Sequence, residues 1–245
     1  MEQRNPSLRN VAWLWFGIAV AILVMGFRQA IFLTPTDAAQ GDVGRIFYYH
    51  VPIAMLSLLF PYLNFAASLL YLFWRTRDPL KALAADAFAL ASAEVTVVYA
   101  TICLLSGMIW GRVAWGIWWT WDARLTSMLL LWLLYVSYLM LRSFSPTGQS
   151  HTLAAVLSVF AAVDVPIVYM SIRWWRTQHP APVFGGGPNA GMDKSMLPAF
   201  LWNLAGWAIW GIFILIFRFA LERKRQLNEQ EAALQAIEAS LEIPQ

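Results

Sequence analysis

The sequence of 245 residues is poor in charge and almost free of cysteine, and both shortages narrow the class of protein. Lysine, arginine, aspartate and glutamate make up 13% of the chain, against about 25% in soluble globular domains. The chain therefore lacks the charged surface that nucleic-acid-binding, disordered or fibrous proteins need. The single cysteine, Cys103, excludes an internal disulfide and any CxxC metal or haem-attachment motif.

Apolar residues, in contrast, make up 60% of the chain and gather into six long runs. A bilayer core needs about 20 apolar residues in a helix. The fourth run, Ser127–Leu141, is short, so its helix is allowed to begin within the preceding loop. The sequence therefore predicts an all-α polytopic membrane protein with six transmembrane helices within residues 1–225. The runs are Val11–Leu33, Val51–Trp74, Ala84–Met108, Ser127–Leu141, Thr152–Ile172 and Leu197–Phe219.

The first run also needs to be weighed against a secretory signal peptide. It exceeds the ~7–15-residue apolar core of such peptides, and no A-x-A cleavage site follows it. We therefore expect an uncleaved first helix.

Lysine and arginine predict the orientation of the helices. The majority of these 17 residues fall in segments on the same side as the N-terminus, and the positive-inside rule makes that side cytoplasmic. Both termini are then cytoplasmic. Three loops face outward, at about 34–50, 109–126 and 173–196.

The chain becomes polar after Phe219. Leu227, Leu234 and Leu241 recur at every seventh position, with Ile237 between them. This spacing predicts a cytoplasmic helical tail over residues 226–245 with a narrow apolar seam. The tail is either a solvated extension or a docking helix for a partner.

The second outward loop, residues 109–127, is rich in tryptophan. One interpretation is an aromatic belt at the membrane interface. Another is an apolar platform for a large flat conjugated ligand, since Trp115, Trp118 and Trp119 share one face if the segment is helical. The tryptophans of this loop are Trp110, Trp115, Trp118, Trp119 and Trp121.

Two charged residues follow these tryptophans. The guanidinium of Arg124 suits a ligand carboxylate, because its planar fork matches that group. Alternatively, Asp122 and Arg124 pair with each other or cap the fourth helix.

The chain has three histidines. His50 and His179 lie in different outward loops, and His151 lies in an inner loop, where we expect a plain loop residue. A lone histidine is usually structural, but two on one side of the membrane suit the two axial positions of a haem iron. Zinc is disfavoured because it requires three or four ligands.

Charged residues also fall within the spans. Glu94, Asp164 and Arg28 are each expected to face the bundle interior and pair with a neighbour. Glu94 could belong to a proton path, but a single acidic residue does not make a proton relay.

The segment Trp115-Gly116-x-Trp118-Trp119-x-Trp121-Asp122-Ala123-Arg124-Leu125-Thr126-Ser127 resembles the WWD signature of haem-handling proteins. Together with His50-Val51-Pro52, His179 after Trp174-Trp175 and the six spans, it is similar to the haem exporter protein C (CcmC) family of cytochrome c maturation. The resemblance covers about residues 10–220.

The resemblance implies a haem-binding protein of the bacterial inner membrane, with its site on the periplasmic side. Its ligand is haem b, with His50 and His179 as axial ligands. It presents haem to the periplasmic chaperone CcmE, and its other partners are CcmD and the ATP-driven pair CcmA and CcmB. A presentation protein is expected rather than a conventional enzyme. The haem-binding residues would be Trp115, Trp118, Trp119, Trp121, Asp122 and Arg124. Our own hypothesis adds that arginines of the outward loops, such as Arg124 and Arg45, receive the haem propionates.

Two other functions remain open. A haem lyase shares the signature, but usually has more spans and histidines inside them, which this sequence lacks. A transporter of haem or another amphiphile needs a polar path through the bundle, for which Glu94 and Asp164 are thin support.

Overall fold

The computed structural model describes residues 6–144, 148–180 and 191–241. Over these ranges the chain is helical, and six helical runs are long and apolar enough to cross a membrane. The prediction of a polytopic all-α membrane protein is confirmed. The runs are Arg9–Leu33, Asp42–Trp74, Pro79–Trp115, Ala123–Phe144, Ser150–Trp174 and Leu197–Leu241.

The helices follow one another in an up-and-down order. Two irregular turns, the π-helix η1 and the 3-10 helix η2, connect the first helix to the second. In chain order the elements are α1 (Pro6–Arg28), η1 (Gln29–Leu33), η2 (Asp42–Ile46), α2 (Phe47–Trp74), α3 (Pro79–Trp115), α4 (Ala123–Phe144), α5 (Gly148–Ala162), α6 (Asp164–Trp174) and α7 (Leu197–Leu241).

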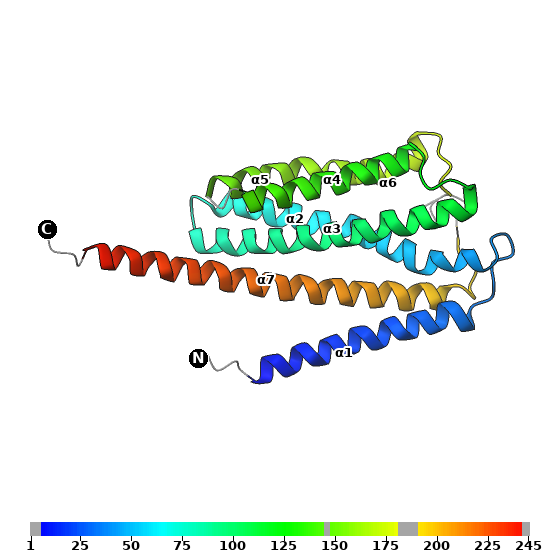
Figure 1. Ribbon diagram of the computed structural model, residues 1–245, viewed down its shortest axis with the longest axis horizontal. Helices are drawn as coiled ribbons and strands as arrows, with labels where there is room; N and C mark the ends of the chain where they lie inside the picture. The colour runs from blue at the N-terminus through cyan, green and yellow to red at the C-terminus, as the bar shows by residue number, and fades with distance from the viewer. Residues whose placement is uncertain (1–5, 145–147, 181–190, 242–245) are drawn as a thin grey trace.

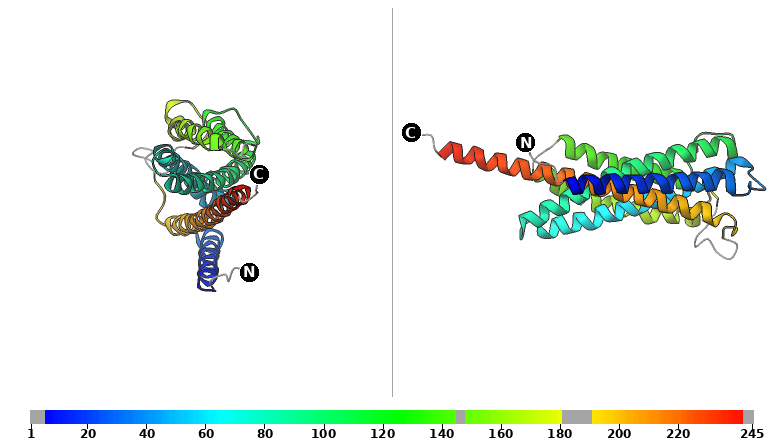
Figure 2. Two further views of the ribbon diagram at one scale, coloured as in Figure 1. Left: turned by 90° about the vertical axis from the view of Figure 1, so that its left-hand side faces the viewer. Right: turned by 90° about the horizontal axis from the view of Figure 1, so that it is seen from below.

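The bundle is layered, with α4, α5 and α6 on one side of the α2–α3 pair and α7 on the other (Figure 1). α1 lies at the edge and contacts the rest of the bundle mainly through α7 (Figures 1 and 2). The first turns of α1 and the last turns of α7 lie at the same end of the molecule (Figure 1).

The core lets α7 approach the α2–α3 pair closely. The rings of Phe60 and Tyr99 lie 5.1 Å apart, and both are almost fully buried. A Cβ atom at Gly211 of α7 would lie 2.6 Å from Cζ of Phe60, so only glycine fits there. The Tyr99 hydroxyl donates a hydrogen bond of 2.5 Å to the Trp207 carbonyl, so this polar group has a partner inside the core.

Local signals set helix ends that apolar runs do not show. α3 begins at Pro79, earlier than predicted, because the side chain of Asp78 accepts a hydrogen bond from the backbone N–H of Lys81. α3 ends at Trp115 because Gly116 adopts the left-handed conformation (φ 77°). α4 begins at Ala123, inside the predicted loop, as the short fourth run allowed.

The fifth span is broken into α5 and α6 at Val163. Pro166 has no N–H to donate to the carbonyl of Ala162, which interrupts the helical hydrogen bonds there. We predicted one continuous span from the sequence, although Pro166 was a signal in the sequence for this break.

The three charged residues within the spans differ in their surroundings. Glu94 forms a bidentate ion pair with Arg218, at 2.5 and 2.6 Å, which confirms the expected pairing. Asp164 is buried, but its Oδ2 has no hydrogen-bond partner among the described residues, so the expected pairing is wrong for that oxygen. Arg28 is exposed and does not face the interior, because it lies on the outer side of the peripheral helix α1.

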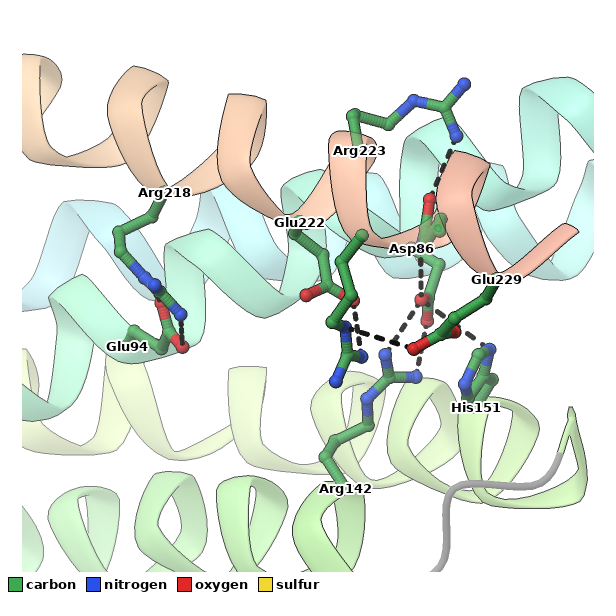
Figure 3. A network of polar contacts seen from close by, with 10 residues as sticks. Asp86, Glu94, Arg142, His151, Arg218, Glu222, Arg223 and Glu229 are labelled. Carbon is green, nitrogen blue, oxygen red and sulfur yellow. Dashed lines mark hydrogen bonds and ion pairs between the residues drawn. The ribbon is translucent and has the colours of Figure 1, made fainter. Parts of the chain in front are cut away.

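A buried polar network ties together the end of the bundle where α7 leaves it (Figure 3). Arg142 of α4 donates to both carboxylate oxygens of Asp86 in α3, at 2.7 and 2.9 Å. Gln226 of α7 donates to Asp86 at 3.3 Å, and Nδ1 of His151 lies 3.6 Å from Asp86. His151 is therefore not a plain loop residue; it lies in the first turn of α5 and belongs to this network.

The predicted tail is a direct continuation of the sixth span. α7 is one helix through Leu241, and the residues from 242 on lie outside the described part of the chain. The seam residues Leu227, Leu234, Ile237 and Leu241 are all exposed.

Candidate functional site

A cavity of about 480 Å³ opens at the end of the bundle opposite the last turns of α7. Its wall is formed by the beginnings of α2 and α4, the ends of α3 and α6, and the segments next to them. This volume lies within the ~300–1,000 Å³ range of small-molecule sites. The wall is mostly apolar, with a few polar groups that point to a particular ligand chemistry.

His50 lines the cavity from the first turn of α2, not from the preceding loop, because α2 begins at Phe47. Its Nδ1 atom lies 2.8 Å from the hydroxyl oxygen of Ser106 in α3. A Cβ atom at Gly107 would lie 3.2 Å from Cε1 of the same imidazole. The ring is thus seated against two small residues of the neighbouring helix.

His179 lines the same cavity from the segment that follows α6. Its Nδ1 atom lies 2.9 Å from the carbonyl oxygen of Pro180, an atom that can only accept a hydrogen bond. Burial lowers the pKa of His179 despite the opposing hydrogen bond to Pro180, and the charge of Arg124 lowers it further. The imidazole is therefore neutral at pH 7, the form that binds metals.

The five tryptophans of the loop are not equivalent. Trp110, Trp115 and Trp119 line the cavity. Trp118 and Trp121 do not, and their exposed fractions are 56% and 76%. Since Gly116 ends α3, the expected helical face of Trp115, Trp118 and Trp119 does not form.

Ring contacts hold the loop in shape. Trp110 packs edge-to-face on Trp115 at 4.9 Å, and Trp119 packs on Trp121 at 5.7 Å. The indole Nε1 of Trp119 is buried without a hydrogen-bond partner in the described part of the protein. A buried donor without a partner is costly, so this N–H is available for a ligand acceptor.

Asp122 caps α4, which was one of the possibilities left open by the sequence. Its Oδ1 accepts from the backbone N–H of Arg124 at 2.8 Å, and its Oδ2 accepts from the N–H of Gln178 at 3.0 Å. Burial opposes ionisation, but hydrogen bonds from Thr177, Arg124 and Gln178 outweigh it and lower the pKa of Asp122. Asp122 therefore connects the tryptophan loop to the segment that carries His179.

The two arginines expected to bind carboxylates lie in different places. Arg124 lines the cavity, and its Nη1 donates to the Val168 carbonyl. Arg45 does not line the cavity. Its guanidinium donates to the carbonyls of Ala30 and Thr34 and to the side chains of Thr36 and Asp42.

Sequence reasoning missed Ser106 and Gly107, which lie within an apolar span. The signal available was the pairing of two small residues, which permits close approach by another side chain. Cys103, which the sequence used only to exclude a disulfide, is buried and forms part of the cavity wall.

The fold and this cavity define a multi-pass membrane protein with a cavity lined by two histidines and three tryptophans. The model of the family described as heme exporter protein C matches residues 4–234. The chain belongs to the haem exporter protein C family, which handles haem in cytochrome c maturation.

Several curated proteins are similar to the chain over most of its length. Heme exporter protein C of Bradyrhizobium diazoefficiens is 36% identical over 240 residues, covering 96% of this chain and 85% of that protein. The protein of the same name from Escherichia coli K12 is 34% identical over 215 residues, covering 87% and 82%. A ccmC-like mitochondrial protein of cytochrome c biosynthesis from Marchantia polymorpha is 33% identical over 223 residues, covering 88% and 90%.

Proposed function

We propose that the cavity binds haem b, with His50 and His179 as the axial ligands of its iron. The observation that carries this proposal is that imidazoles from distant parts of the sequence line one apolar cavity. Both Nδ1 atoms are engaged, with Ser106 and with Pro180, which leaves the Nε2 atoms for the metal.

The other polar groups of the cavity suit the two carboxylates of haem. Arg124 offers a guanidinium, and Trp119 offers an N–H without a partner. We assign the propionates to these two residues and not to Arg45, whose donors bind the chain itself. Trp115 and Trp119 would cover part of the porphyrin surface and exclude water from it.

Haem supplies the reactive vinyl groups, and this chain supplies binding and orientation. We propose that it presents haem to the periplasmic chaperone CcmE, with CcmD and the pair CcmA and CcmB as further partners of the same system. Trp118 and Trp121 lie exposed beside the cavity, and we assign them to the surface that the chaperone approaches.

We propose that the cavity faces the periplasm and that the protein lies in the bacterial inner membrane. The lysine and arginine distribution favours cytoplasmic termini. The beginning of α1 and the end of α7 lie at the opposite end from the cavity, which fits this orientation.

The test is the absorption spectrum of the protein purified in mild detergent and titrated with haem. The parent should show the low-spin spectrum of a bis-histidine haem. His50→Ala and His179→Ala should each lose this spectrum and bind haem more weakly. His151→Ala is the matched control, because His151 lies in the Asp86 network far from the cavity. Unchanged spectra in both cavity variants would overturn the axial ligation.

A second assay follows transfer of haem to the purified chaperone. Trp118→Ala together with Trp121→Ala should slow covalent loading of the chaperone while haem binding persists. Normal loading by this double variant would overturn the presentation role of the exposed tryptophans.

The transporter alternative has less support in the structure. Its principal intramembrane acid, Glu94, is bound by Arg218. Liposomes that contain only this chain should therefore show no haem transport.

A further inference from the structure

Ser106 has the geometry of a residue that controls the proton on His50. Its hydroxyl oxygen lies 2.6 Å from the Ile102 carbonyl oxygen and 3.1 Å from that of Cys103. The same oxygen lies 2.8 Å from Nδ1 of His50. A serine hydroxyl has one proton to donate, and carbonyl oxygens can only accept.

The hydroxyl proton directed at the Ile102 carbonyl leaves a lone pair of Ser106 facing the imidazole. Nδ1 of His50 then carries the ring proton and donates it to Ser106. In a neutral imidazole the other nitrogen, Nε2, is consequently unprotonated and able to bind a metal.

His179 is held in the same way by a different group. Its Nδ1 lies 2.9 Å from the carbonyl of Pro180, so this nitrogen must also be the donor. His50 and His179 thus adopt the same tautomer, in which Nδ1 carries the proton and Nε2 is unprotonated.

We propose that Ser106 is a positioning residue that fixes the Nδ1–H tautomer of His50 and raises the basicity of its Nε2 toward haem iron, with Gly107 providing the space for the ring. This inference rests on the proposed function, because it takes His50 as an iron ligand. A hydrogen bond from the ring N–H of a metal-bound histidine commonly sets its orientation and donor strength.

The tautomer is measured first in haem-free protein, where no iron ligation is involved. Nitrogen NMR of the protein labelled at its histidines separates protonated from bare ring nitrogens, and His50→Gln identifies the His50 signals. We expect His50 to carry its proton on Nδ1 in the parent and to lose this preference in Ser106→Ala. A proton on Nε2 of His50 in the parent would overturn the proposal.

Haem binding is measured second, with haem itself as the probe. Ser106→Ala should raise the haem dissociation constant about 10-fold or more and raise the midpoint potential of bound haem, because a less basic imidazole stabilises ferric iron less. Ser106→Thr keeps the hydroxyl and should restore both values. Gly107→Ala should also weaken binding, since its Cβ would crowd Cε1 of His50 at 3.2 Å.

Ser92→Ala is the matched control. Ser92 is a buried serine of α3 whose hydroxyl donates to the Phe88 carbonyl four residues earlier, as Ser106 does to Ile102, and it does not line the haem cavity. It should leave both the haem affinity and the potential unchanged. Equal affinity and potential in the parent and Ser106→Ala would overturn the role of Ser106 while His50→Ala still loses the bis-histidine spectrum. An unchanged spectrum in His50→Ala would instead overturn the axial ligation itself.

Discussion

Asp122 and Gln178 join the tryptophan loop to the segment that carries His179, beside the two-histidine cavity. Oδ2 of Asp122 accepts a hydrogen bond of 3.0 Å from the backbone N–H of Gln178, while Oδ1 caps α4 through Arg124. The tryptophan loop and the residue next to His179 are thereby held by one carboxylate. This relationship gives Asp122 a structural role that differs from ligand contact.

The first prediction concerns this carboxylate. Asp122→Ala removes the cap and the connection to Gln178, which should cost about 0.5–2 kcal/mol for the cap. Haem affinity should fall as well, because His179 loses the support of its neighbouring segment. Thermal unfolding and haem titration measure the two effects. Asp122→Asn keeps a side-chain oxygen and should be milder; equal losses in both variants would contradict the hydrogen-bonding explanation.

A pH dependence follows from the lowered pKa of Asp122. A carboxyl whose pKa is lower in the folded state stabilises the protein above its ordinary pKa, here 3.8, and loses that effect as the pH falls through the folded pKa. The melting difference between parent and Asp122→Asn should therefore stay constant from neutral pH down to about pH 4 and shrink below it. The haem-free protein is used for this measurement. A difference that already shrinks between about pH 7 and pH 5 would contradict the assignment.

Trp119 should show opposite effects on the free and the haem-bound protein. Trp119→Phe removes the buried Nε1–H that lacks a partner, so the haem-free protein should keep or gain stability. Haem binding should weaken about 10-fold or more, because a hydrogen bond to a charged carboxylate is lost. Trp115→Phe, on the same wall, is the control for ring size. A loss of stability without a loss of haem affinity would contradict the propionate role.

The two arginines should separate into a structural and a ligand-binding one. Arg45→Gln breaks the hydrogen bonds to Ala30 and Thr34 and should lower the melting temperature with little change in the haem spectrum. Arg124→Gln should weaken haem binding more than it lowers stability. Melting curves and haem titrations of the same two preparations decide this. The reverse pattern would return the propionates to Arg45.

The buried ion pair between Arg142 and Asp86 lies at the end of the bundle opposite the cavity and should affect only the stability of the protein. The Arg142 and Asp86 side chains are 5% and 3% exposed, so Arg142→Ala leaves a buried carboxylate without its cation and should cost about 3–5 kcal/mol. Lys81→Ala breaks an exposed ion pair with Asp78 and should lower the melting temperature much less than Arg142→Ala, because solvent screens that pair. Thermal unfolding of both variants in detergent tests the contrast. Similar melting temperatures would contradict the importance of burial.

The sequence alone determined the membrane architecture and the motifs by which the chain resembles the haem exporter protein C family. The six spans follow from the lengths of the apolar runs, because a helix needs about 20 apolar residues to cross the bilayer core. The tryptophan-rich segment and the two histidines predicted a common site, and the structure brings His50, His179 and Trp119 to one cavity. These features are local in the chain, so they can be recognised without tertiary structure.

Only the tertiary structure decided which side chains meet. It placed Trp119 on the cavity wall and Trp121 outside, because Gly116 ends α3 and redirects the chain that follows. Ser106 came beside His50, and Gln226 beside Asp86, because these contacts depend on how helices distant in sequence pack. Such pairings arise from the geometry of packing, which residue types and spacing along one chain do not specify.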